Sequence, residues 1–345
     1  MKLLDYMQKK KTYIIAEMSG NHGGKIEKAI DIVHAAAEAG ADCLKIQTYT
    51  ADTITINCHT EPFLVKTGLW QNDYLYDLYT KAYTPWEWTT PIKEEAEKLG
   101  MDFLSTPFDF TAVDFLESVG VEYYKIASFE IIDIPLVRKV AQTGKPVIMS
   151  CGMASEDEIR EAVDTVKATD NSNLILLKCC SAYPTNYATM NLRTIIDMRE
   201  KFGVPVGLSD HSIGTLTDIA AVALGVPVIE KHICLSREDK TVDGAFSLDK
   251  DEFKQMVTDV RNAELSLGGI NYGPSEDEAQ SYAHRRSLFA VKDIKAGEAF
   301  TAENIRSIRP ACGLHTRYYD ELIGGRIASR DISFGTPLSW EDVQK

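Results

Sequence analysis

Short apolar runs that alternate with amphipathic helical segments constrain the fold of this chain more than any other feature. The alternation predicts eight β-α units, because periodic apolar runs of these two lengths are typical of strands and helices. Eight units within roughly 260 residues predict a TIM (β/α)8 barrel. A doubly wound open sheet is the alternative, although such sheets more often stop at five or six strands. The strand-like runs are residues 13–17, 43–49, 102–108, 122–129, 146–152, 174–180, 205–211 and 227–234.

The pattern changes after residue 268. Residues 269–284 are polar and contain several glycines, which is typical of a linker. Residues 285–345 contain short strand-like runs and turns without further β-α units. The sequence therefore predicts a barrel domain over 1–268, a linker over 269–284 and a small β-rich domain over 285–345.

Charge and cysteine content narrow the class of protein. The net charge of −14 opposes binding to nucleic acid or to an anionic membrane, so an anionic substrate would need a local cluster of basic residues. The first residues lack an apolar core of signal-peptide length, and no later run approaches a membrane span. The seven cysteines include no CxxC pair, which favours reduced thiols. We therefore expect a cytoplasmic protein that binds neither nucleic acid nor membrane.

A long insert, residues 50–82, separates the second strand from its helix. It follows a carboxyl strand end, the side of a barrel on which active sites form. A lid or a substrate-contacting loop and a plain packing element are both compatible with it.

Polar residues end every predicted strand, where a structural barrel would place Val, Ile and Leu. Alternate residues of a strand share a face, so three pairs are each expected to point inward together. These polar ends predict a polar pocket at the carboxyl side of the barrel. The three pairs are Lys45 with Gln47, Ser209 with His211, and Glu230 with His232.

His211 and His232 end neighbouring strands at matching depth, with the carboxylates Asp210 and Glu230 alongside. Imidazoles in this arrangement can share one divalent ion, and we expect Mn²⁺, Mg²⁺ or Co²⁺ in a Lewis-acid role. The third protein ligand of a typical catalytic zinc site is missing. The alternative for each histidine is a hydrogen-bonded pocket residue.

Lys45 and Lys125 end the second and fourth strands and predict a site for phosphate or carboxylate. A Schiff-base nucleophile is the rival interpretation of a lysine in this position. Glu17 ends the first strand and is a candidate general base, a hydroxyl acceptor or the partner of a lysine.

These residues lie in motifs that together resemble the sialic acid synthase (NeuB) family of phosphoenolpyruvate-condensing enzymes. The tail resembles the antifreeze-like (SAF) domain that follows the barrel in this family. Details such as QTYTADTIT and AFSL resemble the branch that makes pseudaminic acid more than the N-acetylneuraminate branch. The matching motifs are AEMSGNHGG (16–24), LKIQTYTAD (44–52), STPFD (105–109), YKIASFEI (124–131), KCCSAYPT (178–185), GLSDHSIG (207–214) and IEKHICL (229–235).

The resemblance implies that phosphoenolpyruvate adds through its methylene carbon to the aldehyde of an open-chain amino sugar. Water then attacks the enolpyruvyl carbon, and phosphate leaves by C–O cleavage. The implied sugar is 2,4-diacetamido-2,4,6-trideoxy-L-altrose, with the legionaminate and N-acetylneuraminate precursors as alternatives. A Schiff-base aldolase and a non-catalytic sugar-binding barrel are the less favoured alternatives to this activity. The implied roles are acid/base catalysis by Glu17, metal binding by His211 and His232, phosphoenolpyruvate binding by Lys45, Lys125, Ser128, Ser150, Ser181 and Ser209, and sugar binding by Gln47, Tyr183, Asp243 and Arg309.

The resemblance also implies a domain-swapped homodimer, in which the tail domain of one subunit caps the barrel of its partner. Arg309 of the IRPACGL motif would then reach the acyl group of the sugar. Three positions depart from the family pattern: Ser181 replaces a common Asn, VDGAFSL differs around Asp243, and RPACGL differs from RPGxGL.

Overall fold

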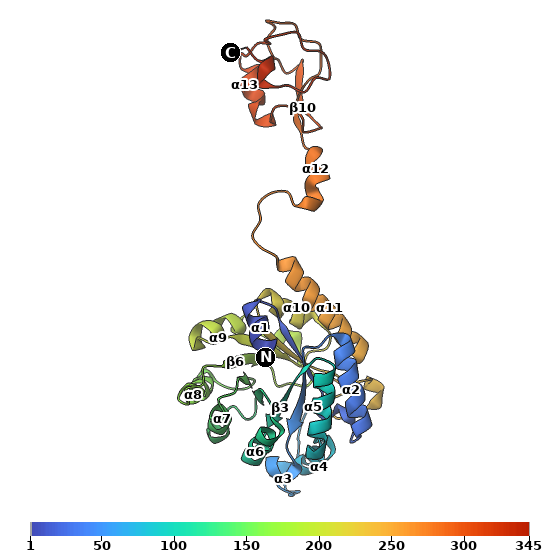
Figure 1. Ribbon diagram of the computed structural model, residues 1–345, viewed down its shortest axis with the longest axis vertical. Helices are drawn as coiled ribbons and strands as arrows, with labels where there is room; N and C mark the ends of the chain where they lie inside the picture. Colours follow the sequence, from blue (N-terminus) through green and yellow to red (C-terminus); the bar gives the residue numbers. More distant parts are fainter. Residues whose placement is uncertain (1, 345) are drawn as a thin grey trace. The chain divides into compact units, whose positions relative to one another are not determined.

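The computed structural model describes residues 2–344, and the chain divides into two compact units, Met1–Gly268 and Gly269–Lys345. The first unit is a closed barrel of eight parallel strands, so the predicted TIM barrel is confirmed (Figure 1). Its strands are β1 (Tyr13–Glu17), β2 (Cys43–Thr48), β3 (Asp102–Pro107), β4 (Tyr124–Ile126), β5 (Val147–Ser150), β6 (Leu174–Cys179), β7 (Val206–Asp210) and β8 (Val228–His232).

Helices follow the strands around the outside of the barrel (Figure 1). Local signals in the sequence set several of their ends. Ser155 caps α8 in a capping box with Glu158, and Gly40 ends α2 with a φ of 88°. The outer helices are α2 (Ile26–Ala39), α5 (Thr89–Lys98), α6 (Phe110–Val119), α7 (Ile134–Ala141), α8 (Glu156–Lys167), α9 (Thr194–Phe202), α10 (Leu216–Ala223) and α11 (Lys250–Leu267).

One strand is much shorter than the sequence predicts. The apolar run 122–129 forms strand only over Tyr124–Ile126, because the chain then turns at residues 127–130. The backbone N–H of Glu130 donates to the carbonyl of Ala127 at 3.1 Å and closes this turn. The turn places the loop after β4 at the carboxyl end of the barrel.

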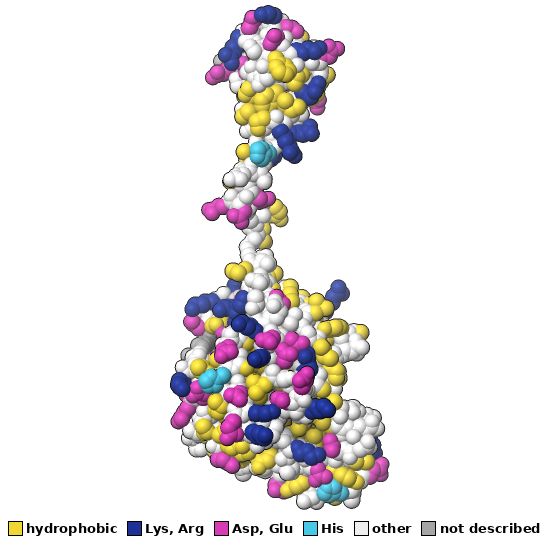
Figure 2. All heavy atoms as spheres, turned by 90° about the vertical axis from the view of Figure 1, so that its right-hand side faces the viewer, with side chains coloured by type: hydrophobic (Ala, Val, Ile, Leu, Met, Phe, Trp, Pro, Cys, Tyr) yellow, Lys and Arg dark blue, Asp and Glu magenta, His cyan; other side chains and the backbone are white. Residues whose placement is uncertain are grey.

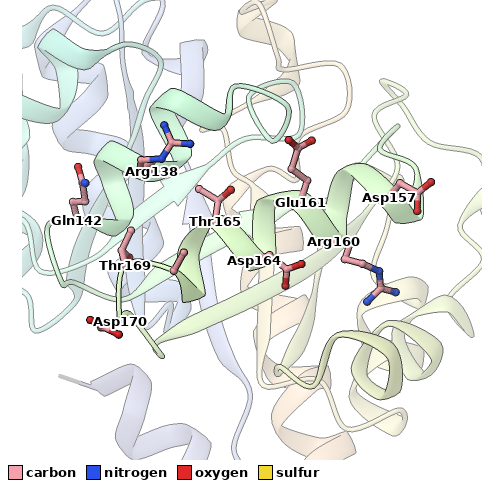
Figure 3. A pocket seen from close by; sticks show the side chains of 10 residues that line it. Arg138, Gln142, Asp157, Arg160, Glu161, Asp164, Thr165, Thr169 and Asp170 are labelled. Atoms are coloured by element: carbon pink, nitrogen blue, oxygen red, sulfur yellow. The ribbon is translucent and has the colours of Figure 1, made fainter.

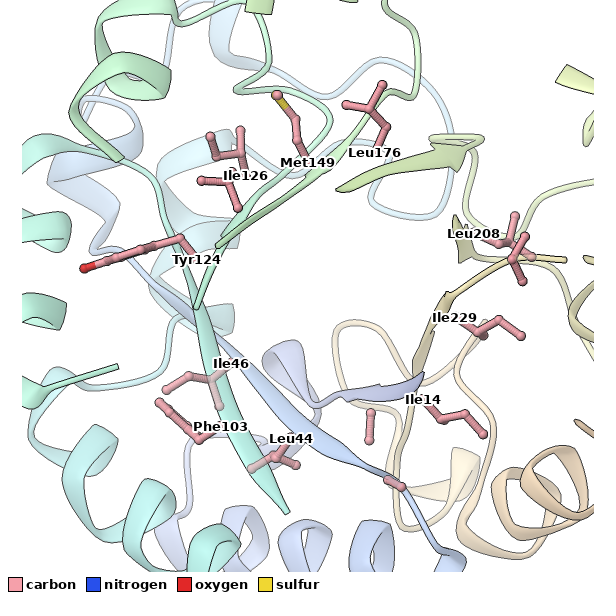
Figure 4. Packing of buried hydrophobic residues seen from close by; sticks show 14 of the residues in the cluster. Ile14, Leu44, Ile46, Phe103, Tyr124, Ile126, Met149, Leu176, Leu208 and Ile229 are labelled. Atoms are coloured by element: carbon pink, nitrogen blue, oxygen red, sulfur yellow. The ribbon is translucent and has the colours of Figure 1, made fainter. Parts of the chain in front are cut away.

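The barrel has two apolar layers because successive strand residues point to opposite faces. Outward side chains such as Ile14, Leu44 and Ile229 pack beneath the helices (Figure 4). Inward side chains form a second cluster with Leu3 of α1 (Lys2–Gln8). The inward apolar members are Tyr13, Ile15, Cys43, Leu104, Tyr123, Ile148, Ile175, Leu177 and Val228, and polar residues replace them toward the carboxyl strand ends.

The second unit has its own small core. Strand β9 (Ser287–Ala290) pairs antiparallel with β10 (Ile305–Ile308), and isolated bridges such as Ile294 with Ile332 continue the β-structure. Two short helices, α12 (Ala279–Ala283) and α13 (Tyr319–Ile323), complete the unit. The first of them lies within the segment predicted as linker. Across residues 2–344, the structure contains no helix that is both long enough and apolar enough to cross a bilayer.

Removing a side chain from the layer between barrel and helices should lower the free energy of unfolding strongly. Leu176 is fully buried there, so Leu176→Ala should cost about 2–5 kcal/mol through lost burial and the cavity left behind. Leu265→Ala is the matched control, since this leucine is 79% exposed on α11 and should change stability by less than about 0.5 kcal/mol. Urea unfolding measures both, and equal losses would contradict the assigned packing.

Candidate active site at the carboxyl ends of the barrel strands

A cavity of about 420 Å³ lies at the carboxyl ends of the barrel strands. This volume is in the usual range for a small-molecule site. The cavity brings together most of the residues predicted from the sequence. Those that line it are Lys45, Gln47, Lys125, Ser128, Ser150, Tyr183, Ser209, His211, His232 and Asp243.

Three predicted residues are placed differently. Glu17 is fully buried and contacts the cavity residues Lys45 and Gln47 without lining the cavity itself. Ser181 lies at the edge of the site, where its Oγ would be 2.3 Å from a Cβ added at Gly152. Arg309 is an exposed residue of the second unit.

Four buried charges form what we call the charged floor of the cavity: Glu17, Lys45, Lys125 and Glu230. Lys45 Nζ donates to Glu17 Oε2 at 2.6 Å and lies 3.7 Å from Glu230 Oε2. Lys125 Nζ lies 3.9 Å from the same Glu230 oxygen. Strand register explains the contacts, since Glu17 pairs with Lys45 across β1 and β2. Two ammonium groups and two carboxylates thus neutralise one another in a site that water barely reaches.

The charged floor shifts the pKa values of its members in different directions. Burial raises the pKa of Glu17, and the charge of Glu230 adds to this while Lys45 opposes it. Burial lowers the pKa of Lys125, which has no carboxylate as close as the one beside Lys45. Burial opposes ionisation of Glu230 too, but Lys125 and Lys45 outweigh it and lower its pKa. Of the two carboxyl groups in the charged floor, Glu17 is therefore the one better placed to hold and release a proton.

The imidazoles of His211 and His232 lie side by side, with ring centroids 5.2 Å apart. His211 Nδ1 lies 3.0 Å from the carbonyl oxygen of Cys180, so Nδ1 carries a proton. Although burial opposes it, the contacts with Cys179 and Cys180 raise the pKa of His211, so Nε2 offers a lone pair only when the ring is neutral. His232 Nδ1 is buried and has no hydrogen-bond partner among residues 2–344. Burial and the nearby positive charges lower the pKa of His232 well below its usual value, which keeps this ring neutral.

These two nitrogen donors fit a divalent ion. A lone pair on a neutral imidazole is a metal ligand, and a hydrogen bond from the other ring nitrogen to a carbonyl, as in His211, orients such ligands. The part of the chain that the structure describes contains no group of three or more His, Cys, Asp or Glu residues that could hold a metal. The further ligands would therefore be water or substrate oxygens, as predicted from the sequence.

Asp210 does not lie beside the histidines as the sequence suggested. Its side chain points outward, where it accepts hydrogen bonds from Thr217 at the start of α10 and from Ser212. Lys231 Nζ, which is fully buried, forms an ion pair with Asp210 and donates to the carbonyls of Ser212 and Gly214 at 2.7 and 3.0 Å. This contact, which we call the outer clamp, ties β8 to the loop after β7. It holds from outside the two strand ends that carry the histidines.

The insert 50–82 forms one side of the cavity. Its chain doubles back through backbone hydrogen bonds between Val65 and residues 72 and 73, and then forms α4 (Leu75–Ala82). Trp70 Nε1 donates to the carbonyl of Val242 at 3.0 Å, which fixes the insert against the loop after β8. We call its cavity-lining residues the insert wall: Ile54, Val65, Trp70, Leu75, Leu78, Tyr79 and Ala82.

Two further residues of the site escaped the sequence prediction. Glu130 lines the cavity, and its Oε2 is buried without a hydrogen-bond partner in residues 2–344. Burial raises the pKa of Glu130 to about 7. Phe246 lines the cavity with its ring centroid 4.9 Å from that of His232. Glu130 directly follows the run 122–129 predicted as strand, so only the early end of β4 reveals its position in the site.

A second, more open groove of about 780 Å³ lies outside the barrel between α7 and α8 (Figure 3). Its labelled side chains, among them Arg138, Arg160 and Asp164, come from the surface of these helices. No strand-end residue reaches it. Charges of both signs are interspersed over much of the face of the barrel unit in Figure 2. The cavity over the charged floor is therefore the candidate active site.

Comparison with known proteins identifies the family. Residues 32–272 match the NeuB family and residues 285–344 match the SAF domain, so the chain belongs to the NeuB family and the predicted resemblance is confirmed. It is 47% identical over 344 residues to a pseudaminic acid synthase of Campylobacter jejuni, covering all of both chains. It is 42% identical to that of Helicobacter pylori, covering 96% of this chain and 98% of the relative.

Solved structures agree with this assignment. The N-acetylneuraminic acid synthetase of Leptospira borgpetersenii matches with a TM-score of 0.69 at 32% identity, covering 78% of this chain and 90% of that one. The spore coat polysaccharide biosynthesis protein SpsE of Bacillus subtilis matches with a TM-score of 0.65 at 31% identity, covering 97% of this chain and 95% of that one.

Breaking the outer clamp should destabilise the barrel. Lys231→Met leaves the buried carboxylates of Asp210 and Asp218 without their cation, and should cost about 3–5 kcal/mol of unfolding free energy. Lys201→Met is the matched control, because Lys201 is 42% exposed and solvent screens its ion pair with Glu156, so its loss should change stability little. Urea unfolding measures both variants. A loss as small for Lys231→Met as for Lys201→Met would show that the clamp is not a stabilising contact.

Glu130 should make stability fall as the pH rises from about 4.5 to 7. In this window the buried carboxyl keeps its proton in the folded chain and has lost it in the unfolded chain. Glu130→Gln should therefore match wild type at pH 4.5 and exceed it at pH 8 by up to about 3 kcal/mol. Urea unfolding at both pH values tests this, with exposed Glu122→Gln as the control for loss of one charge. A difference independent of pH would contradict the raised pKa.

Proposed function

We propose that this chain is a nonulosonic acid synthase that condenses phosphoenolpyruvate with open-chain 2,4-diacetamido-2,4,6-trideoxy-L-altrose to give pseudaminic acid and phosphate. The full-length similarity to pseudaminic acid synthases supports this choice of sugar, and a legionaminate synthase is less similar at 35% identity. The observation that carries the chemistry is the charged floor with its two buried lysines beside the paired imidazoles of His211 and His232.

Phosphoenolpyruvate would bind over Lys45 and Lys125. Lys125 Nζ donates to Ser150 Oγ at 2.6 Å, and this hydrogen bond holds the ammonium group at the carboxyl ends of β4 and β5. Ser128 Oγ accepts the backbone N–H of Gly152 at 3.1 Å and hydrogen-bonds to Cys179, and its hydroxyl proton could turn from Cys179 to a phosphate oxygen. A bound anion would also favour the charged form of Lys125, whose pKa burial lowers.

Gly152 leaves the space for this anion. A Cβ at this position would lie 2.3 Å from Ser181 Oγ and 2.9 Å from Ser128 Oγ, so no larger residue fits without displacing both hydroxyls. Ser209 donates its own proton to Glu230 Oε1 at 3.0 Å. We therefore assign Ser209 to the orientation of Glu230 in the charged floor, and Ser128 and Ser181 to the phosphate.

The condensation joins the methylene carbon of phosphoenolpyruvate to the aldehyde carbon of the sugar, and the aldehyde oxygen takes up a proton. Water then adds to the enolpyruvyl carbon, loses a proton, and phosphate departs with the C–O bond electrons. A divalent Mn, Mg or Co ion bound by His211 and His232 would polarise the aldehyde. Glu17, with a raised pKa and a hydrogen bond from Gln47 at 2.9 Å, is the group that would exchange these protons.

The sugar would lie between the histidines and the insert wall. Tyr183 packs against His211 with ring centroids 4.5 Å apart, and its hydroxyl, which hydrogen-bonds to Ser181, would be shared with a sugar oxygen. Asp243 also lines the cavity, and burial raises its pKa although contacts with Ser19 and Gly20 oppose this. We assign Tyr183, Gln47 and Asp243 to the sugar.

We further propose that the active form is a domain-swapped homodimer in which Arg309 reaches the partner's sugar site. Large apolar side chains exposed on the loops at the carboxyl ends of the strands support it, because a monomer rarely leaves such a rim uncovered. The rim comprises Phe129, Ile132, Met153, Ile213 and Leu216, each at least 50% exposed.

A reducing compartment, and hence the cytoplasm, suits the thiols of this chain. All seven cysteines are free. Cys179 lies in the cavity itself, with its Sγ 3.8 Å from His211 Nδ1, where oxidation would obstruct the site.

Loss of either imidazole or of the metal should abolish most of the condensation. His211→Ala or His232→Ala should lower kcat/KM by about 10²-fold or more, since the aldehyde loses its Lewis-acid activation. Phosphate release from phosphoenolpyruvate and the trideoxy sugar measures this, with and without EDTA and added Mn²⁺. His34→Asn on exposed α2 is the control and should keep full activity. Phosphate release that survives EDTA undiminished would overturn the metal role, and a borohydride-trapped adduct would favour a Schiff-base aldolase.

A further inference from the structure

We infer that the insert wall recognises the deoxygenated end of the sugar, so that Val65, Trp70 and Leu75 determine specificity for a 6-deoxy acceptor. This inference rests on the proposed function and extends it to the residues that read carbon 6. It also assigns a role to the insert 50–82. The sequence alone was compatible with a lid or substrate-contacting loop and with a plain packing element.

The first observation is the sorting of side chains within the insert. The segment contains charged residues such as Asp52, Lys66 and Asp77, yet every residue that it contributes to the cavity is aliphatic or aromatic. Most of the insert wall is half-buried, whereas Leu78 is 7% exposed. Apolar surface that faces a cavity gains free energy only when an apolar group covers it.

The second observation is the division of the cavity into two kinds of surface. The strand ends supply the charged floor, the serine hydroxyls and the two imidazoles. The insert wall instead supplies aliphatic and aromatic side chains, and none of its lining side chains is charged. A ligand that fits both surfaces carries charge and hydroxyl groups at one end and apolar groups at the other.

The third observation is the short path between the wall and the reacting centre. Trp70 packs against Tyr183 with ring centroids 5.5 Å apart, and Tyr183 packs against His211 at 4.5 Å. Trp70 and Tyr183 both pack against Phe246, at 6.4 and 5.0 Å. A sugar whose aldehyde lies at the histidines therefore extends its far end toward the insert wall.

The far end of the open-chain sugar is carbon 6. In a 6-deoxy sugar this carbon is a methyl group, which the wall can cover. A 6-hydroxyl group would lose its hydrogen bonds to water and gain little on the wall, where Trp70 Nε1 already donates to the carbonyl of Val242 and the polar group that remains is the Tyr79 hydroxyl. An apolar pocket rejects an added hydroxyl group only moderately, so we expect a preference of roughly 10- to 100-fold in kcat/KM.

Kinetics with two sugars test the inference: 2,4-diacetamido-2,4,6-trideoxy-L-altrose and its 6-hydroxylated counterpart, each with phosphoenolpyruvate and phosphate release as the readout. Val65→Thr and Leu75→Asn keep side-chain size and add polarity to the wall. Each should lower the wild-type preference for the 6-deoxy sugar about 10-fold, mainly through a higher KM for that sugar. Leu69→Asn is the matched control, because Leu69 lies in the same insert, is 43% exposed and does not line the cavity.

The outcomes separate the inference from the proposed function. Phosphate release with neither sugar would overturn the proposed function. Phosphate release with equal kcat/KM for both sugars, or a preference that the wall variants leave unchanged, would overturn the inference alone. The KM for phosphoenolpyruvate and the urea midpoint should stay at the wild-type values in the wall variants, since a general loss of structure would change these too.

Discussion

The site depends on the mutual neutralisation of the charges in the floor of the barrel. A buried ammonium or carboxylate group without a partner would shift its pKa and lose its charge. Glu17 and Glu230 allow Lys45 and Lys125 to be buried, and the lysines in turn favour the charged form of Glu230. Glu230 Oε2 lies 3.7 and 3.9 Å from the two lysine nitrogens, farther than the 2.6 Å between Glu17 and Lys45, so the ion pairs of Glu230 are the looser contacts of the floor.

Side chains alternate in direction along each strand, so the residues that face the cavity are separated from those that stabilise the barrel from outside. On β8, Glu230 and His232 face the cavity, whereas Lys231 between them faces outward. The same alternation on β7 turns Ser209 inward and Asp210 outward. Polar groups on the outer face therefore form a clamp that supports the strand ends, while those on the inner face line the cavity.

Much of this arrangement could be predicted from the sequence because strand periodicity is a local property. The parity of Lys45 with Gln47, and of Glu230 with His232, places each pair on one face before any contact is known. The same parity puts Asp210 on the outward face of β7, so the separate expectation that its carboxylate lies beside the histidines was wrong. The carboxylate of Asp210 instead forms an ion pair with the buried Lys231 of the neighbouring strand β8. This pairing depends on the folded barrel and could not be predicted from the sequence.

The sequence by itself determined the eightfold β-α order, the barrel, the inward face of each strand and the residue types at the strand ends. Only the tertiary structure decided which lysine pairs with which carboxylate, how early β4 ends before Glu130, and which side of the insert faces the cavity. The physical reason is the distance along the sequence between the residues that interact. Strand and helix periodicity depends on neighbouring residues, whereas the insert is oriented by distant contacts such as that of Trp70 with the carbonyl of Val242.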